Sequence, residues 1–509
     1  SWSAVTSEDL AGYRLYRSAG QSPDTSGTGL TEDLVSAAAF TDSTATENRT
    51  YRYGVTAVDT AGNESALSEE ASAFRYPSQI QAEVSRSFGD AAGPGDYRLV
   101  ALPGETSRPV EDVVSGEAGS EWQAYRDDGS QDDFLQKYDG SERFTFEPGN
   151  GFWVTATSDL AFEDSVSTVS LQGDSAATIT LREGWNVISN PIDKAVEWSR
   201  VEQANGGSLQ PIWSFQGAFS QDDSLGSAVS GRGYYLFNGS ADRTELLIPY
   251  PDSPSSPTSK TESRASSTAG QEANLLSLSA TPVGSEGPTS TVQVGVQSET
   301  TDSVVAPPSR FEVVSLRVKA GEEEQKKDRS GLLMTEHRKG GGDGETFHLR
   351  LKSQGGAPVS LSASGLGETE GQSVALIRPS AGKTYRLRAD EPVQITESQE
   401  EIALELAVGT EGYVDKQADQ VIPDEVTLTS YPNPVQKQAT VEYTLPEQTD
   451  VRVALYDVLG RRVATLEEGS KQAGRHRIQL ERTGLSSGVY FYRLTTEKTT
   501  KVKKMMLIK

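Results

Sequence analysis

The stretch TVEYTLPEQTDVRVALYDVLGRRVATL at 440–466 decides the fold class of this chain. Apolar and polar residues alternate along it, with Val451, Val453 and Leu455 on one face and a turn residue at Gly460. This period of two is typical of a β-strand that buries one face. Short runs rich in Val, Thr, Tyr and Phe, separated by Gly, Pro, Asn, Asp and Ser, recur along the rest of the chain. The pattern predicts an all-β protein of tandem β-sandwich domains joined by flexible linkers.

Length and composition limit the classes of function. The chain has 509 residues, which corresponds to roughly three to four domains of about 150 residues each. Its 73 acidic and 47 basic residues give a net charge of −26, which disfavours binding to nucleic acid or anionic lipid. The absence of cysteine excludes disulfides, thiolate metal sites and a cysteine nucleophile. Because no apolar run approaches the ~18 residues of a membrane-spanning helix, we expect no transmembrane segment. The negative net charge leads us to expect no nucleic acid partner.

The charge is unevenly distributed. Residues 424–509 carry a net charge of +4, and the remainder of the chain carries −30. This change of sign indicates a separate C-terminal domain with a separate task. Low lysine use, 17 against 30 arginines, together with the acidic excess fits a halophilic organism or a generally acidic secreted protein, and both interpretations stay open.

The N-terminal segment resembles a known module. RTYRYGVTAVDTAGNESALSE at 49–69 places Tyr51 and Tyr53 on one face of a strand that ends in a turn, and AGYRLYRSAG at 11–20 alternates in the same way. The segment resembles a fibronectin type III module that lacks most of its first strand. By this resemblance Trp2 is the core tryptophan and Tyr51 is the corner tyrosine. The chain has no signal-peptide pattern at its start, so we expect it to begin inside a domain.

The next segment contains an internal repeat. YRLVALPG at 97–104 corresponds to GWNVISNPID at 184–193, and GNGFWVTA at 149–156 corresponds to GRGYYLFN at 231–238. Each Gly-x-Gly opens a strand and not a helix, which disfavours a phosphate-binding loop and favours a bulge or close backbone approach.

Few residues suggest catalysis, metal binding or ligand binding. The three histidines, His337, His348 and His476, are scattered over polar segments, and no common catalytic motif occurs. The acidic run RDDGSQDD at 126–133 could hold calcium but lacks the EF-hand spacing, so a solvated loop is favoured. We therefore predict no catalytic residue, no metal site, no cofactor and no enzymatic activity. Several aromatics could stack on sugar rings, although a core role is favoured for them: Trp122, Trp153 and Trp213.

The last 84 residues carry the most informative motifs. They contain SYPNPV, VALYDVLGRRVATL, LSSGVYFYRL and a basic end, KVKK followed by LIK, in this order. The segment resembles the type A C-terminal sorting domain of cargo proteins of the type IX secretion system, as found in Bacteroidetes- or Rhodothermota-like bacteria. The resemblance implies recognition by the export and sortase machinery, a secreted or outer-membrane-attached location, and lipopolysaccharide as a further partner. The residues that the resemblance assigns to the sorting signal are Tyr431, Pro432, Asn433, Pro434, Gly460, Gly488, Tyr490, Lys503, Lys504 and Lys509.

These observations divide the chain into seven segments. The sandwiches are expected to be of the fibronectin type III-like or immunoglobulin-like kind. The segments are a fibronectin type III-like module at 1–76, β-rich repeat copies at 77–165 and 166–250, a disordered linker at 251–272, a β-sandwich at 273–409, a linker at 410–425 and the sorting domain at 426–509.

Three functions are open at this point. The first is a non-catalytic C-terminal portion of a secreted or surface protein, with β-sandwich spacers and a sorting domain. The second is a polysaccharide-binding or adhesive module. The third is the accessory tail of a secreted hydrolase, such as a peptidase, whose catalytic domain lies upstream.

Overall fold

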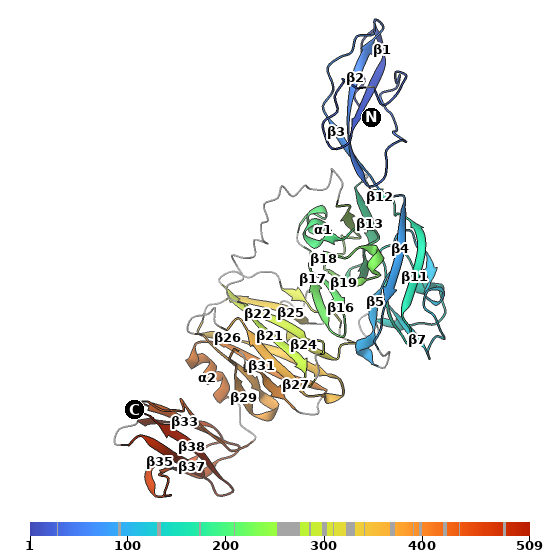
Figure 1. Cartoon of the computed structure of the whole chain (residues 1–509). Helices are drawn as coiled ribbons and strands as arrows, with labels where there is room; N and C mark the ends of the chain where they lie inside the picture. Colours follow the sequence, from blue (N-terminus) through green and yellow to red (C-terminus); the bar gives the residue numbers. More distant parts are fainter. Residues whose placement is uncertain are drawn as a thin grey trace. The chain divides into compact units, whose positions relative to one another are not determined.

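The chain forms two compact units in a computed structural model (Figure 1). The first comprises Ser1–Ser266 with Pro307–Glu312, and the second comprises Ser267–Ala306 with Val313–Lys509. Strands dominate both units, which confirms the predicted all-β class and its tandem sandwiches. No helix among the described residues is long and apolar enough to cross a membrane. The structure describes residues 1–27, 29–89, 93–129, 134–172, 175–207, 209–251, 275–284, 287–297, 303–308, 310–321, 331–339, 342–366, 372–389, 391–396, 400–420, 425–436, 438–481 and 485–508.

The N-terminal segment forms one antiparallel sheet in the order β1-β2-β3. These strands are β1 Leu10–Ser18, β2 Arg49–Asp59 and β3 Ala71–Arg75. The buried Tyr51 hydroxyl accepts a hydrogen bond from the backbone N–H of Thr46 at 3.1 Å, which ties the preceding loop to β2. Trp2 packs edge-on against Tyr13 with ring centroids 5.2 Å apart. Both aromatics therefore fix loops to the sheet, and the fibronectin type III resemblance stays a prediction.

Two four-stranded sheets of equivalent order follow, β5-β10-β7-β8 and β14-β19-β16-β17. A Cβ atom on Gly151, just before β10, would lie 2.6 Å from the carbonyl oxygen of Val100, so only glycine lets the two strands approach this closely. The strands of the two sheets are β5 Arg98–Val100, β7 Trp122–Asp127, β8 Leu135–Lys137, β10 Phe152–Ala156, β14 Gly184–Ser189, β16 Ile212–Phe215, β17 Phe219–Asp222 and β19 Gly233–Asn238.

Smaller elements complete this region. The two-stranded sheets β11-β4, β15-β18 and β6-β9 and the three-stranded sheet β12-β13-β20 cover two separate apolar cores, one in each half. Their bounds are β4 Gln79–Arg86, β6 Arg108–Pro109, β9 Thr145–Phe146, β11 Leu160–Ser167, β12 Leu171–Gln172, β13 Ala176–Thr180, β15 Val196–Glu197, β18 Ser224–Leu225, β20 Glu245–Pro249 and helix α1 Trp198–Ala204.

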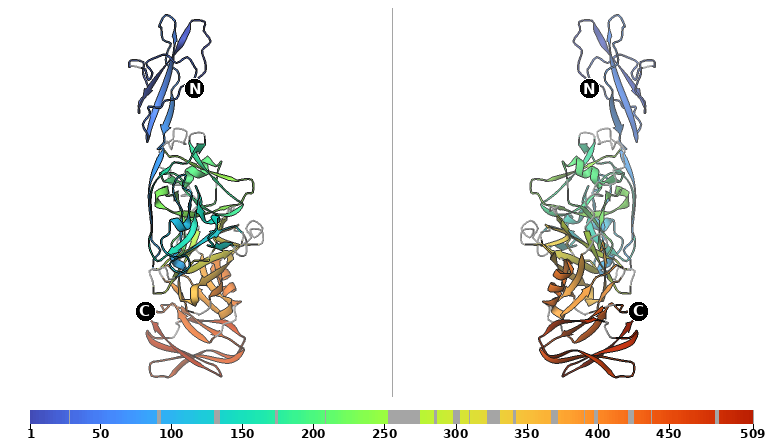
Figure 2. Two further views of the ribbon diagram at one scale, coloured as in Figure 1. Left: turned by 90° about the vertical axis from the view of Figure 1, so that its right-hand side faces the viewer. Right: turned by 90° about the vertical axis from the view of Figure 1, so that its left-hand side faces the viewer.

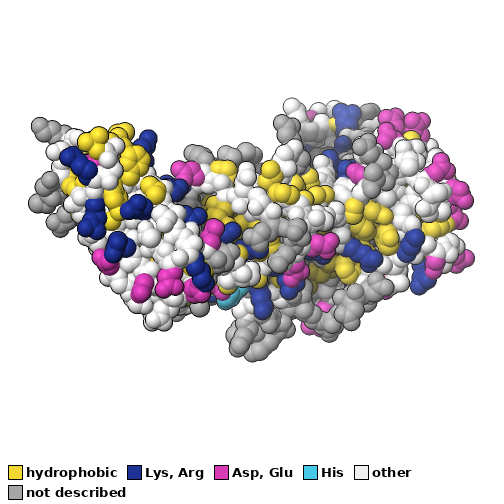
Figure 3. Space-filling model, turned by 90° about the horizontal axis from the view of Figure 1, so that it is seen from below, with side chains coloured by type: hydrophobic (Ala, Val, Ile, Leu, Met, Phe, Trp, Pro, Cys, Tyr) yellow, Lys and Arg dark blue, Asp and Glu magenta, His cyan; other side chains and the backbone are white. Residues whose placement is uncertain are grey.

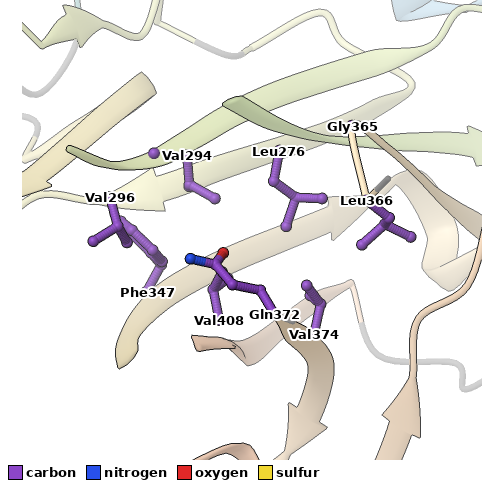
Figure 4. A pocket seen from close by; sticks show the side chains of 10 residues that line it. Leu276, Val294, Val296, Phe347, Gly365, Leu366, Gln372, Val374 and Val408 are labelled. Carbon is purple, nitrogen blue, oxygen red and sulfur yellow. The ribbon is translucent and has the colours of Figure 1, made fainter. Parts of the chain in front are cut away.

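The third module, at 275–409, is built from one continuous sheet whose two parts pack face to face. Its order is β29-β28-β31-β26-β24-β25-β22-β21-β27-β30, and β23 pairs with β25. Side chains of β21 and β22 face those of β26, β28 and β31 across an apolar interior (Figure 4). The strands are β21 Leu275–Pro282, β22 Ser290–Gln297, β23 Val304–Val305, β24 Val314–Lys319, β25 Leu332–Lys339, β26 Gly344–Ser353, β27 Val359–Ser364, β28 Ser373–Arg378, β29 Lys383–Arg386, β30 Val393–Ile395 and β31 Glu401–Gly409.

The hollow in this interior is too small for an organic ligand. It offers about 20 Å³, little more than one water molecule needs, and its lining is apolar except for Gln372 (Figure 4). We assign it to imperfect packing between the two faces of the module.

The two predicted linkers differ from each other. The linker at 251–272 lies outside the described residues from position 252 onward. The linker at 410–425 instead contains helix α2, Glu411–Asp419, which begins where the Thr410 hydroxyl accepts a hydrogen bond from the Tyr413 backbone N–H at 3.3 Å. Val414 and Ala418 lie one helical turn apart and are both buried, so this segment forms an amphipathic helix and not a loop.

The C-terminal domain is a two-layer β-sandwich, drawn in red in Figures 1 and 2. One sheet has the order β32-β33-β36, and the other has the order β35-β34-β37-β38. Alternate residues of both sheets fill one core, including Val441, Tyr443, Val453 and Leu455. The strands are β32 Thr427–Tyr431, β33 Gln438–Leu445, β34 Thr449–Tyr456, β35 Arg462–Lys471, β36 Gly474–Glu481, β37 Gly488–Thr495 and β38 Thr500–Leu507.

A buried polar chain joins the two β-rich copies. The Asp127 carboxylate at the end of β7 accepts hydrogen bonds from the Tyr235 hydroxyl at 2.5 Å and from Arg182 at 2.7 Å. The Tyr235 oxygen in turn accepts a hydrogen bond from the Trp153 indole at 3.1 Å. Burial raises the pKa of Asp127, although the bonds from Tyr235 and Arg182 oppose this rise. The two halves thus share one hydrogen-bonded network.

We predict that Asp127→Ala lowers the free energy of unfolding of this region by about 2 kcal/mol, because the buried Tyr235 hydroxyl loses its acceptor. Denaturant unfolding followed by tryptophan fluorescence measures this, since five of the six tryptophans lie between positions 122 and 213. Asp164→Ala is the control: it removes the exposed pair with Arg108, which is worth about 1 kcal/mol at most. Equal losses in the two variants would contradict the role of the network.

Candidate functional site

The YPNP loop and the last strand of the chain lie against each other. The Asn433 side chain accepts a hydrogen bond from the Met506 backbone N–H at 2.9 Å and donates one to the Lys504 carbonyl oxygen at 3.1 Å. The backbone of Val435 continues this contact, with its N–H 2.7 Å from the Met506 carbonyl oxygen and its carbonyl oxygen 2.9 Å from the Ile508 N–H. The loop therefore pairs with the end of β38 as a short parallel strand would.

The rest of this edge is open. β38 lies at the end of its sheet and pairs with β37 on one side. Along the described part of the chain, no strand pairs with the other side of β38 between Thr500 and Val502. An open strand edge presents unpaired N–H and C=O groups that another extended segment can bond.

Cationic and apolar side chains are exposed over this domain, some of them on this edge. Lys501, Lys503 and Lys504 of β38 are all exposed. Figure 3 shows hydrophobic side chains flanked by Lys and Arg side chains over this domain, at the left end of the view. Most of the exposed large hydrophobic side chains among the described residues lie in this domain, namely Tyr431, Val458, Leu459, Val463, Val502 and Met506. Such a concentration in a small domain is typical of an interaction surface.

A second charged cluster lies on β36, in the other sheet. Arg475 and Arg477 both contact the Glu442 carboxylate, at 2.8 and 2.9 Å. Burial lowers the pKa of Arg477, but the hydrogen bond and charge of Glu442 outweigh it and raise this pKa above its ordinary value. The Tyr431 hydroxyl donates a long hydrogen bond of 3.5 Å to the same carboxylate, so the YPNP loop also contacts this cluster.

Most of the residues assigned to the sorting signal lie on or near this surface. All four residues of the YPNP loop are exposed, and so are Lys503 and Lys504, which lie on opposite faces of β38. Gly460 occupies the turn between β34 and β35 with a φ of 76°, which favours glycine. Tyr490 is half-buried and donates a hydrogen bond to the Ser486 carbonyl oxygen at 3.1 Å. Gly488 begins β37 and pairs with Leu507, which also bridges Val435 directly after the YPNP loop, and Lys509 lies outside the described residues.

Sequence reasoning did not single out the exposed apolar side chains of this domain. Val458, Leu459, Val502 and Met506 are each more than a third exposed. The available clue was the pair Val458-Leu459 directly before Gly460, where a turn exposes both side chains.

The aromatics considered for glycan stacking are not accessible. Trp122, Trp153 and Trp213 are only 4%, 2% and 4% exposed. Phe311 covers Trp153 with ring centroids 5.0 Å apart, and the indole of Trp122 donates to the Gly116 carbonyl oxygen at 3.0 Å. The stacking interpretation fails for these three residues because their rings pack inside the protein, as the favoured core interpretation predicts.

The other candidates for chemistry lie apart from one another. His348 is 3.7 Å from Glu405, and His476 stacks on Tyr443 at a centroid distance of 5.0 Å. Within the described ranges, no three His, Asp or Glu side chains are grouped as a metal site requires. The acidic run 126–133 lies partly outside these ranges, and its Asp127 is engaged in the buried network.

Comparison with known proteins identifies the tail. Residues 429–509 match the family described as the secretion system C-terminal sorting domain. This match indicates that the chain is a secreted or cell-surface cargo of the type IX secretion system. No curated protein matches the chain.

Similarities to solved structures are distant. A polysaccharide lyase is 10% identical, with 46% of this chain and 39% of that chain covered and a TM-score of 0.18. Dimeric latent PorU from Porphyromonas gingivalis is 10% identical, with 91% and 32% covered and a TM-score of 0.17. An S-layer protein is 11% identical, with 97% and 50% covered and a TM-score of 0.14. The chain thus spans half or less of each of these structures, and none supports a shared activity.

We predict that Asn433→Ala destabilises the sorting domain by about 1–2 kcal/mol, because both side-chain bonds to β38 are lost. Hydrogen exchange should show a faster Met506 amide in the full chain. Asn433→Asp keeps the acceptor for this amide and should retain most of its protection. Gln448→Ala, which removes one exposed bond of 3.4 Å to Ser470, serves as the control and should change little. An unchanged Met506 amide in Asn433→Ala would contradict the contact.

Proposed function

We propose that residues 426–509 are recognised by the type IX export machinery through the surface formed by the YPNP loop and β38. The observation that carries this proposal is the contact that the Asn433 side chain and the Val435 backbone make with the backbone of the end of β38. This contact brings two separate motifs of the sorting signal to one place. A receptor can therefore contact both at once.

The free edge of β38 supports recognition by strand addition. An extended segment of the receptor could pair with the open part of this edge, next to the stretch already bonded by the loop. Main-chain bonds would supply affinity, and the flanking Val502 and Met506 side chains would add apolar contact.

Charge supports the same surface. The three lysines of β38 belong to the segment 424–509 of net charge +4, whereas the remainder of the chain carries −30. An acidic receptor segment would be attracted to this domain and repelled by the remainder. Electrostatic selection of this kind favours correct orientation during encounter.

The modules ahead of the sorting domain are proposed to be non-catalytic spacers. Their tryptophans are mostly buried, and within the described ranges their His, Asp and Glu side chains form no group of three that could hold a metal ion. After export, we propose that a sortase removes the sorting domain and that the cargo stays at the cell surface, with lipopolysaccharide as its attachment partner. This function is compatible with an upstream hydrolase domain, for which the chain would serve as an accessory tail.

Deletion of 426–509 tests the proposal directly. In a bacterium with type IX export, the full chain should reach the medium or the cell surface, and the truncated chain should stay in the periplasm. An inert reporter fused to 426–509 should be exported. Normal export of the truncated chain, or retention of the reporter, would refute the proposal.

A matched pair of triple variants tests the surface itself. We expect Lys501→Gln, Lys503→Gln, Lys504→Gln to reduce export about tenfold, since each exposed cation contributes roughly 0.5 kcal/mol to binding. Arg350→Gln, Lys352→Gln, Arg388→Gln removes the same charge from exposed positions of the module at 275–409 and should leave export near normal. Quantitative immunoblots of medium and periplasm measure both. Equal defects would indicate that total charge, and not the β38 surface, matters.

A further inference from the structure

Helix α2 presents two carboxylates to the sorting domain. Asp415 and Asp419 are four residues apart and so lie on one face of the helix. An Asp415 oxygen is 3.0 Å from Arg477 of β36, and an Asp419 oxygen is 3.7 Å from Arg477 and 3.9 Å from Arg475. The acidic face of α2 therefore meets the cationic pair on β36.

Other side chains of α2 hold it on the preceding sandwich. Val414 is fully buried against Ala375, Ile377 and Ala407 of the sandwich strands. The Tyr413 hydroxyl is 3.0 Å from the Thr346 hydroxyl of β26. Arg386 of β29 also pairs with Asp415, which links this carboxylate to the sandwich. The helix is thus a fixed part of the sandwich module and presents a fixed pair of charges.

The charges balance only when α2 is in place. Arg475 and Arg477 have side chains that are 11% and 24% exposed, and within their own domain the carboxylate that pairs with them is Glu442. These exposures hold with α2 in place, and without α2 two cations beside one carboxylate leave an excess positive charge that favours a further anion. With α2, three cations (Arg386, Arg475 and Arg477) meet three carboxylates (Asp415, Asp419 and Glu442).

We propose that the Arg475–Arg477 face of β36 is a binding surface for two carboxylates spaced one helical turn apart, and that α2 occupies it in this chain as an electrostatic clasp. The clasp holds the sorting domain in one orientation on the sandwich module. The clasp rests on the proposed function in one respect only. Glu442 also bonds Tyr431 of the YPNP loop, so Arg475 and Arg477 lie beside the proposed recognition surface. Release of α2 would free these two cations there.

The experiment measures docking and not export. The chain has no cysteine, so two spin labels can be placed on the full-length protein at the exposed positions Lys352→Cys in the sandwich and Thr465→Cys in the sorting domain. Pulsed electron paramagnetic resonance then gives the distribution of distances between the labels. We expect one narrow distribution in the parent chain. In Asp415→Asn, Asp419→Asn the distribution should widen about twofold or more, because hydration replaces the ion pairs. Asp415→Glu, Asp419→Glu keeps both charges and should stay narrow.

A charge-matched variant controls for a general effect. Glu391→Gln, Glu401→Gln also removes two carboxylates from the sandwich, where they pair with Arg388 and Arg350 at 3.5 and 3.2 Å, and it should leave the distribution narrow. A second label pair inside the sorting domain, Thr465→Cys with Thr500→Cys, should give the same distance in every variant and so shows that the domain stays folded. A narrow distribution in the Asn variant, or equal widening in the control, overturns the clasp. Neither result would bear on whether the tail directs export.

Discussion

The sorting domain depends on hydrogen bonds made to both edges of one strand. β37 bonds one edge of β38, while Asn433 and Val435 bond the end of the other. Because the bonds from Asn433 and Val435 join a loop near the beginning of the domain to its last strand, they connect the two ends of the sandwich. The same bonds bring the exposed YPNP loop beside the lysines of β38, which makes one surface from two distant motifs. The same bonds therefore stabilise the domain and form its candidate recognition surface.

The strand pattern could be predicted because it is local. Alternation at Val451, Val453 and Leu455 reports which face a strand buries, and Gly460 marks a turn whatever the rest of the chain does. The motifs of the tail were equally visible because their order and spacing are properties of the sequence. The all-β class and the sorting domain followed from such local information.

Contacts between distant residues could not be predicted in this way. Asn433 and Met506 are 73 positions apart, and Tyr235 and Asp127 are 108 positions apart, so nothing in the neighbouring sequence indicates either bond. Helix α2 was missed because a short amphipathic segment next to Pro- and Asp-containing sequence has the composition of a linker. Its helical form depends on burial of Val414 and Ala418 against the sandwich, which is a tertiary effect.

The way in which Asn433 holds β38 has an evolutionary consequence. Its two bonds go to a carbonyl oxygen and an amide of the main chain, atoms that every residue except proline possesses. The side chains of Lys504 and Met506 therefore take no part in the bonds that Asn433 makes to hold the loop. Substitutions along the outer face of the strand can accumulate with little penalty to folding, so a lineage could retune its specificity for a diverging receptor while the scaffold stays the same.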